Sequence, residues 1–257
     1  MIVSLFRLSG VGAAMHVLCL LAALLPSRVS AEQATVAVAA NFATTLARLV
    51  APFEARGDHT IRVASGSTGK LYAQIVHGAP FDLFLAADTE RPDRLIADGL
   101  ASPDDRITYA VGRLVLWSGP DDPSEALLEG GKIPRLAIAN PGLAPYGVAA
   151  MEVLEHYGLT GARAPALVMG ENIAQTVAML ATGNADHGLV ALSMASAAEG
   201  KARLWTIPAT AHAPIHQDAV LLTRGQDNPA ARAFFAYLRS AEARTIIVAD
   251  GYDEAGP

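Results

Sequence analysis

Cysteine, charge and basic clusters are scarce in this chain. Cys19 is the only cysteine among 257 residues, so no intramolecular disulfide can form. Charged residues make up 17% of the sequence, and the 25 acidic residues outnumber the 19 lysines and arginines. Nucleic-acid binding relies on clustered basic side chains that displace counterions from phosphates. The charge balance therefore excludes a nucleic-acid partner.

The common motifs of covalent and metal catalysis are also missing. The sequence contains no G-x-S-x-G, H-E-x-x-H or C-x-x-C pattern. The segment that ends in Gly69-Lys70 superficially matches a phosphate-binding P-loop, but Ala64 stands at its first glycine position and Leu71 follows the lysine. We therefore expect no enzymatic activity, no catalytic residue and no cofactor, and we expect Lys70 to be a solvated helix residue.

One alternative of the metal-binding kind stays open. His212 and His216 lie four residues apart with Asp218 nearby, which allows a surface metal site. Pro214 lies between the histidines and keeps them off a shared helix face. The alternative is therefore weak on sequence grounds.

The only long hydrophobic run lies at the N-terminus. Residues 1–7 carry one positive charge, residues 11–25 are apolar apart from His16, and Val29-Ser30-Ala31 is a small-residue cleavage motif. This order is typical of a secretory signal peptide, and the run is short for a membrane span. Cleavage after Ala31 predicts export to the periplasm and leaves a chain without cysteine and with a net charge of −8. An uncleaved N-terminal anchor is the alternative.

The remaining chain alternates between strand and helix patterns. Near-continuous apolar runs predict strands at 35–39, 59–64, 81–86, 136–139, 166–169, 188–192 and 219–223, with a longer extended stretch at 107–117 that Gly112 interrupts. Helical spacing predicts helices at 42–57, 71–76, 89–98, 146–157, 173–181 and 229–238. Residues 119–134 are rich in glycine, proline and acids and predict a loop. Buried strands that alternate with helices indicate an α/β fold with parallel strand pairs.

Polar and small residues gather where predicted strands run into helices. Four such junctions lie at 39–41, 66–69, 140–147 and 170–173. Ligands of open α/β sheets bind at the carboxyl ends of strands, where helix N-termini present free N–H groups. These junctions offer hydroxyls, an amide and backbone N–H groups, and none requires a cation. Such neutral donors suit a small anion.

The same junctions resemble those of the periplasmic molybdate-binding proteins of ABC transporters. The matching segments are 40–42 (A-N-F), 65–69 (S-G-S-T-G), 78–88 (G-A-P-F-D-L-F-L-A-A-D), 140–147 and 188–192. The run at 78–88 is the most specific of them. The similarity follows the whole predicted mature chain in order.

This resemblance implies a fold and a function. The fold is the type II two-lobe periplasmic-binding-protein fold, with mixed, mostly parallel sheets flanked by helices and with two crossover strands. The chain divides into a signal peptide (1–31), lobe I (32–113 plus 219–257) and lobe II (114–218). The protein would capture molybdate, and tungstate as well, in a cleft between the lobes. It would act as a monomer and deliver the anion to an ABC transporter permease in the inner membrane.

The resemblance also implies the site residues. It implies oxyanion contacts at four positions, with two further candidates beside them in the same loops: Asn41, Thr68, Tyr146 and Ile173, then Ala40 and Ser67. Ala40 stands where the most similar branch of the family has a hydroxyl residue, and Thr68 replaces a serine. Molybdenum would be bound only as the oxyanion, with no direct protein ligand to the metal.

Neutral donors would also select among oxyanions. Phosphate near neutral pH keeps a proton, which needs an acceptor in the site, whereas molybdate, tungstate and sulfate carry none. Asp82 and Asp88 are expected in turn and capping roles, because a carboxylate repels an anion. Glu171 is the one carboxylate at a junction, and we expect it to face solvent.

Other interpretations of the same residues remain open. Asn41, Ser67 and Thr68 could simply cap helices, Tyr146 could be a packing residue, and Ile173 offers only its backbone N–H. A sulfate-binding or other oxyanion-binding protein is the alternative within the same class. An exported hydrolase on the same scaffold is an alternative from another class, although none of the seven histidines lies beside the four junctions. A sensor or adhesion module that never meets a transporter is a third.

Overall fold

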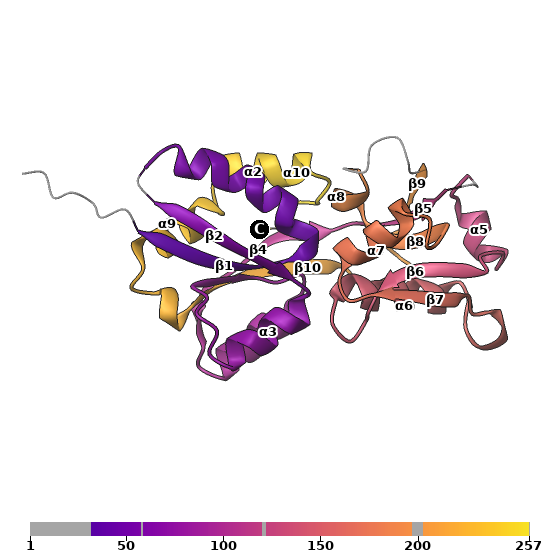
Figure 1. Ribbon diagram of the computed structural model, residues 1–257, viewed down its shortest axis with the longest axis horizontal. Helices are drawn as coiled ribbons and strands as arrows, with labels where there is room; N and C mark the ends of the chain where they lie inside the picture. Colours follow the sequence, from indigo (N-terminus) through magenta and orange to yellow (C-terminus); the bar gives the residue numbers. More distant parts are fainter. Residues whose placement is uncertain (1–31, 58, 120–121, 197–202, 257) are drawn as a thin grey trace, which may run out of the picture. The chain divides into compact units, whose positions relative to one another are not determined.

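Two five-stranded sheets organise the protein. The computed structural model describes residues 32–57, 59–119, 122–196 and 203–256, so the predicted signal peptide lies outside the described residues. The first sheet has the order β2-β1-β3-β10-β4 (Figure 1). Its strands are β1 (Gln33–Ala39), β2 (Thr60–Gly66), β3 (Leu83–Leu85), β4 (Ala101–Gly112) and β10 (Ile215–Leu222).

The second sheet is built on the same plan, with the order β7-β6-β8-β5-β9. Its strands are β5 (Leu114–Ser118), β6 (Arg135–Ala139), β7 (Ala166–Gly170), β8 (His187–Ala191) and β9 (Arg203–Thr206). In each sheet the first three strands in this order pair in parallel and the last two join them antiparallel. The sheets are therefore mixed as predicted, but only four of the eight strand pairs are parallel.

Helices flank both sheets. They are η1 (Ala40–Phe42), α2 (Ala43–Glu54), α3 (Thr68–Val76), α4 (Glu90–Ala97), α5 (Glu125–Glu129), α6 (Pro145–His156), η2 (Gly161–Arg163), α7 (Ile173–Ala181), α8 (Leu192–Ala195), η3 (Thr223–Gly225), α9 (Pro229–Tyr237) and α10 (Ala241–Ala249). Figure 1 shows α2 and α10 on one side of the first sheet and α3 on the other.

The strand pattern explains how the first sheet carries helices on both faces. Val36 and Val38 pack in one apolar cluster with residues of α2, α9 and α10, whereas Ala37, between them, packs in another with Leu71 and Ile75 of α3. Successive side chains of a strand point to opposite faces, so a continuous apolar run fits a strand that is covered on both sides. A separate apolar cluster fills the second sheet and its helices.

The chain passes between the sheets twice. Strand β4 ends at Gly112 and β5 begins at Leu114, so the extended stretch predicted over 107–117 is two strands in different sheets. The chain returns to the first sheet through β10, which begins at Ile215. The predicted boundary between lobe II and lobe I, after residue 218, thus falls inside a strand. The division into lobes remains a prediction.

Several elements differ from their prediction. Helix α5 lies within the predicted loop at 119–134, where the side chain of Leu128 is fully buried. Strand β9 and helix α10 were not predicted, because β9 is only four residues long and α10 buries only Ala243 and Ile247. None of the described helices is long and apolar enough to cross a membrane.

Candidate functional site

A small cavity is lined by residues from all four predicted junctions. Its free volume is about 10 Å³, whereas pockets for drug-sized ligands occupy roughly 300–1,000 Å³. Its lining combines the ends of β1 and β2 of the first sheet with the starts of α3, α6 and α7. The lining residues are Ala39, Ala40, Asn41, Gly66, Ser67, Thr68, Ala87, Ala144, Pro145, Tyr146, Asn172 and Ile173. All six sequence-predicted site residues are among them, and no lining residue carries a charge.

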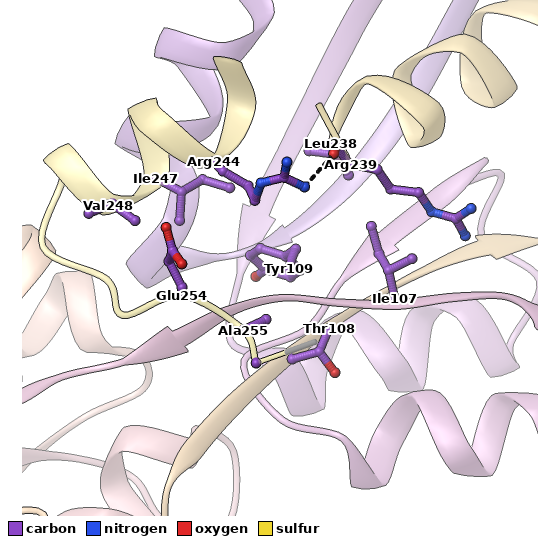
Figure 2. A pocket seen from close by; sticks show the side chains of 11 residues that line it. Ile107, Thr108, Tyr109, Leu238, Arg239, Arg244, Ile247, Val248, Glu254 and Ala255 are labelled. Atoms are coloured by element: carbon purple, nitrogen blue, oxygen red, sulfur yellow. Dashed lines mark hydrogen bonds between the residues drawn. The ribbon is translucent and has the colours of Figure 1, made fainter. Parts of the chain in front are cut away.

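Larger cavities lie elsewhere and contain none of the predicted residues. One of about 240 Å³ lies between β4 and the segments around α9 and α10 (Figure 2). Arg239 and Arg244 border it, and the Arg244 guanidinium donates to the Arg239 carbonyl oxygen at 2.8 Å. Helix α10 begins at Ala241, between the lining residues Arg239 and Arg244, but none of the four predicted junctions reaches this cavity. The small cavity is therefore the better candidate for binding an anion.

Three helix N-termini meet at the small cavity. Thr68 is the first residue of α3, Ile173 is the first residue of α7, and Tyr146 is the second residue of α6, after Pro145. Backbone N–H groups in the first turn of a helix have no acceptor within the helix. They also lie at the positive end of the helix dipole. The cavity is thus lined by donors that the fold itself leaves without a helical partner.

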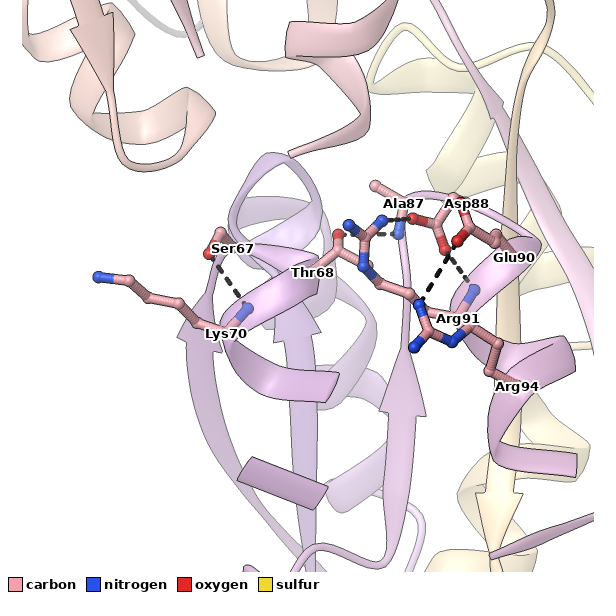
Figure 3. Close-up of polar contacts among 8 residues, drawn as sticks. All are labelled: Ser67, Thr68, Lys70, Ala87, Asp88, Glu90, Arg91 and Arg94. Atoms are coloured by element: carbon pink, nitrogen blue, oxygen red, sulfur yellow. Dashed lines mark hydrogen bonds and ion pairs between the residues drawn. The ribbon is translucent and has the colours of Figure 1, made fainter. Parts of the chain in front are cut away.

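The capping side chains leave these first N–H groups free. Ser67 is the N-cap of α3, and its hydroxyl accepts the backbone N–H of Lys70 at 3.4 Å (Figure 3). Asn172 caps α7 in the same way and accepts the backbone N–H of Gln175 at 3.0 Å. Both caps bind the third N–H of their helix. The capping role considered for Ser67 therefore exists and does not compete with a ligand at the first N–H.

The Thr68 hydroxyl is positioned by an accepted hydrogen bond. Its oxygen accepts the backbone N–H of Ala87 at 3.3 Å, as Figure 3 shows. The side chain is 1% exposed. Because a hydroxyl donates one hydrogen and accepts through two lone pairs, this contact leaves the Thr68 O–H able to donate into the cavity. Thr68 is not the cap of α3, since Ser67 takes that position.

Asn41 uses its side chain within the protein. It lies in η1 rather than at a helix N-cap, and Phe42 precedes α2 without a side-chain cap. The Asn41 amide nitrogen donates to the side-chain oxygen of Gln217 at 2.9 Å and to the hydroxyl of Tyr252 at 3.2 Å. Both of its hydrogens are therefore used, which leaves the backbone N–H of Asn41 as its donor toward the cavity. Its position inside η1, with Phe42 at the N-cap of α2, contradicts the capping interpretation.

The Tyr146 hydroxyl is held in place by Gln217. It accepts the side-chain N–H of Gln217 at 3.2 Å, which leaves its own O–H able to donate. It lies so close to Gly112 that a Cβ there would be 2.2 Å from the hydroxyl oxygen. Burial raises the pKa of Tyr146 well above its usual range, and Tyr252 adds to the rise, while the Gln217 hydrogen bond opposes it. The side chain is therefore buried and neutral, and its O–H and the backbone N–H are both potential donors.

Ala40 and Ile173 contribute apolar side chains. They are 6% and 3% exposed, and both belong to the apolar cluster of the second sheet. The methyl group of Ala40 lies where a serine or threonine would place a further hydroxyl. These two residues can reach a ligand only through their backbone N–H groups.

The charged groups near the cavity are paired. Lys70 Nζ lies 2.6 Å from a carboxylate oxygen of Glu171, and these side chains are 46% and 62% exposed. Glu171 thus faces solvent as expected. Asp88 pairs with Arg91 (Figure 3), and burial raises the pKa of its carboxyl while Arg91 opposes the rise. The Asp82 carboxylate accepts the backbone N–H of Thr35 at 2.7 Å.

Sequence reasoning missed the residues behind the cavity. Gln217, Tyr109 and Tyr252 form a buried polar cluster with Asn41 and Tyr146. The one signal for it is Gln217 itself, a polar residue shortly before the apolar end of β10. Its partners come from segments distant in the sequence, so no local pattern brings them together.

The metal-site alternative finds no support among the described residues. They contain no group of three or more histidine, cysteine, aspartate or glutamate side chains that could hold a metal ion. Asp218 is fully buried, and its carboxylate contacts Arg106 and accepts the hydroxyl of Thr108 at 2.7 Å. It is therefore already committed and cannot join His212 and His216 as a ligand.

Comparison with known proteins identifies the class. A family model described as "Bacterial extracellular solute-binding protein" matches residues 34–253, and the chain belongs to this family. Family membership places it among solute-binding proteins rather than enzymes.

The individual relatives are similar over nearly their whole length. The chain is 45% identical to the molybdate-binding protein ModA of Azotobacter vinelandii over 92% of this chain and 96% of that protein. It is 41% identical to ModA of Rhodobacter capsulatus over 87% of this chain and 89% of that protein. The solved structure of the Azotobacter vinelandii periplasmic molybdate-binding protein superposes with a TM-score of 0.79 at 36% identity, covering 87% of this chain and all of that one. The predicted periplasmic-binding-protein fold is confirmed.

Proposed function

We propose that this protein captures molybdate, and tungstate as well, in the small cavity and delivers it to an ABC transporter. The observation that carries the proposal is the convergence of helix N-termini and buried hydroxyls on one cavity without a charged lining residue. Relatives at 45% and 41% identity carry the name molybdate-binding protein, which supports the choice of anion.

The donors divide into two kinds. Thr68 and Ser67 would donate through their hydroxyls, and Thr68 through its backbone N–H as well. Asn41, Ala40, Tyr146 and Ile173 would donate through backbone N–H groups. Hydrogen bonds to a charged group contribute roughly 1.5–3 kcal/mol each, so about six to eight of them offset the cost of burying a dianion. The six residues supply a set of that size.

The lining also accounts for selection against protonated anions. None of its side chains carries a carboxylate, and the nearby Glu171 is exposed and paired with Lys70. A proton on the bound anion would find no strong acceptor, which penalises hydrogen phosphate. Molybdate and tungstate avoid this penalty. Sulfate avoids it as well, so the protein has to discriminate between sulfate and the larger anions by the size of the cavity.

The family and the N-terminal sequence indicate where the protein would act. Extracellular solute-binding proteins act outside the cytoplasm, and residues 1–31 would direct export and be cleaved after Ala31. Residues 32–113 with 219–257 would form one lobe and residues 114–218 the other. The loaded protein, a monomer, would dock on an inner-membrane permease.

Isothermal titration calorimetry on purified residues 32–257 tests the proposal. We expect tight binding of sodium molybdate and sodium tungstate, much weaker binding of sulfate, and no heat with phosphate near neutral pH. Tight sulfate binding without a molybdate signal would replace the proposal with a sulfate-binding function. Absence of binding for all four anions would reject an oxyanion site altogether.

A further inference from the structure

Gln217 occupies the centre of the buried polar cluster behind the cavity. It lies on β10, where the chain returns to the first sheet, and its side chain is fully buried. Its oxygen accepts the amide N–H of Asn41 at 2.9 Å and the hydroxyl of Tyr109 at 3.1 Å. Its nitrogen donates to the hydroxyl of Tyr146 at 3.2 Å. One amide therefore contacts three side chains, two of which belong to residues that line the cavity.

The partners of Gln217 come from opposite sides of the cavity. Asn41 follows β1 of the first sheet, whereas Tyr146 lies in the first turn of α6, which packs with the second sheet. Tyr252 also holds Asn41, because the Tyr252 hydroxyl donates to the Asn41 carbonyl oxygen at 2.7 Å. A displacement of the Gln217 amide would thus move donors on both sides at once.

The cluster has no spare room. A Cβ on Gly112 would lie 2.2 Å from the Tyr146 hydroxyl oxygen and 2.8 Å from the Gln217 side-chain nitrogen. Gly112 is the last residue of β4, directly before the chain crosses to the second sheet. The space that a larger residue would fill is occupied by the hydrogen bond between Gln217 and Tyr146.

The side chains around Gln217 are neutral or paired with an opposite charge. Burial raises the pKa of Tyr109 and Tyr146 well above the usual range and that of Tyr252 to about 12, so all three keep their hydroxyl protons. Other charged groups nearby are paired: Asp218 contacts Arg106, and Asp88 contacts Arg91. His216 is exposed.

We propose that Gln217 is a positioning residue for the oxyanion site, which holds Asn41 and Tyr146 in the geometry that binds the anion without touching it. This inference rests on the proposed function. Its basis is the hydrogen-bonded amide that joins two lining residues from opposite sides of the cavity. Loss of the amide would lower affinity because the donors would no longer be held in place before the anion arrives.

Two substitutions separate positioning from volume and from charge. Gln217→Met keeps the approximate size and removes every hydrogen bond of the amide. Gln217→Glu keeps the shape, and its protonated carboxyl can accept from Asn41 and Tyr109 and donate to Tyr146. Burial raises the pKa of a carboxyl, in documented cases to about 8–9, so this variant should change its protonation state in an accessible pH range.

The measurement is the dissociation constant of sodium molybdate by calorimetry between about pH 6 and pH 8.5. We expect Gln217→Met to bind roughly ten- to a hundredfold more weakly at every pH. Gln217→Glu should bind within a few-fold of the unmodified protein at the acid end and lose affinity as the pH rises. Gln74→Glu, at an exposed position of α3, adds the same charge outside the cluster and should leave binding unchanged.

The outcomes are distinct. If Gln217→Met binds like the unmodified protein, the side chain at position 217 only fills space, and the inference is wrong. Any loss of affinity in Gln217→Glu would then come from its added charge alone. If Gln217→Met does not fold, Tyr109→Phe removes one partner of Gln217 that does not line the cavity and should weaken binding several-fold, and unchanged affinity there would overturn the inference. If the unmodified protein fails to bind molybdate, the proposed function fails instead, whatever the variants do.

Discussion

The two sides of the cavity supply their donors in different ways. On the side of the first sheet, Ser67 and Thr68 add buried hydroxyls to the helix start of α3. On the side of the second sheet, Ile173 offers only its backbone N–H, and Tyr146 offers its backbone N–H together with one hydroxyl, which Gln217 holds in place by donating to it. One side therefore depends on which residues stand there, and the other depends mainly on the path of the backbone.

This difference has a consequence for how the site tolerates change. A hydroxyl can be removed by one substitution that leaves the fold in place. A backbone N–H can be removed only by moving the helix that carries it, or by proline. Substitutions that test the first side should act mainly on binding, whereas those that test the second should act on folding and binding together.

The largest effect is expected from Gly147→Ala, on the second side. A Cβ at this position would lie 2.2 Å from the Ala139 carbonyl oxygen and 2.8 Å from the backbone nitrogen of Pro141, and neither backbone atom can move freely. We expect the free energy of unfolding to fall by about 3 kcal/mol, and molybdate binding to be lost as the start of α6 shifts. Urea unfolding and calorimetry measure the two effects.

Gly57→Ala is the matched control for this substitution. Nothing lies within 4 Å of a Cβ at Gly57, which is remote from the cavity, so stability and binding should both stay near those of the unmodified protein. If Gly147→Ala bound molybdate normally, the second side would not depend on the backbone path that we describe.

A smaller effect, mainly on binding, is expected from Thr68→Val on the first side. The substitution keeps the shape, removes the O–H that can donate into the cavity, and takes away the acceptor of the Ala87 N–H. We expect molybdate affinity to fall by about 1–3 kcal/mol, and the free energy of unfolding to fall by about 1 kcal/mol because the buried Ala87 N–H loses its acceptor. Thr68→Ser keeps the hydroxyl and should retain most of the affinity. Equal binding by Thr68→Val and Thr68→Ser would remove the hydroxyl from the list of donors.

The same contrast explains which features of the site could be predicted from the sequence. The helix-start donors were predictable, because each junction follows an apolar strand within a few residues, and all six predicted residues line one cavity. The side-chain roles of Asn41 and Tyr146 were not, because both are fixed by Gln217, which is distant from them in the sequence. Whether the six residues contact an anion remains a prediction.

The fold was predictable to a similar depth. The long apolar strands and most helices follow from periodicity, but β4 and β10 each begin several residues before their predicted start, at Ala101 and Ile215. In both strands the unpredicted part contains polar residues whose partners lie on the neighbouring strand. Asp218 of β10, for example, contacts Arg106 and Thr108 of β4. Strand pairing stabilises these residues, and local propensity does not reveal it.

The smallest effect is expected from Glu171→Gln, which tests whether charge joins the two sides. Lys70 lies on α3 beside the first side, and Glu171 precedes α7 on the second, with both side chains largely exposed. Exposed ion pairs contribute roughly 0–1 kcal/mol, so stability should change little. The freed Lys70 should tighten molybdate binding by at most about threefold at low salt, and the gain should vanish at high salt, because screening weakens exposed charges.

Lys70→Gln completes this test, since it leaves Glu171 unpaired and should weaken binding slightly over the same range of salt. The two variants should therefore shift the dissociation constant in opposite directions and by similar small amounts. A loss of more than about tenfold in either one, independent of salt, would mean that the ion pair holds the two sides together. The cavity would then depend on a charged contact in addition to hydroxyls and backbone donors, and the contrast between its sides would no longer account for affinity.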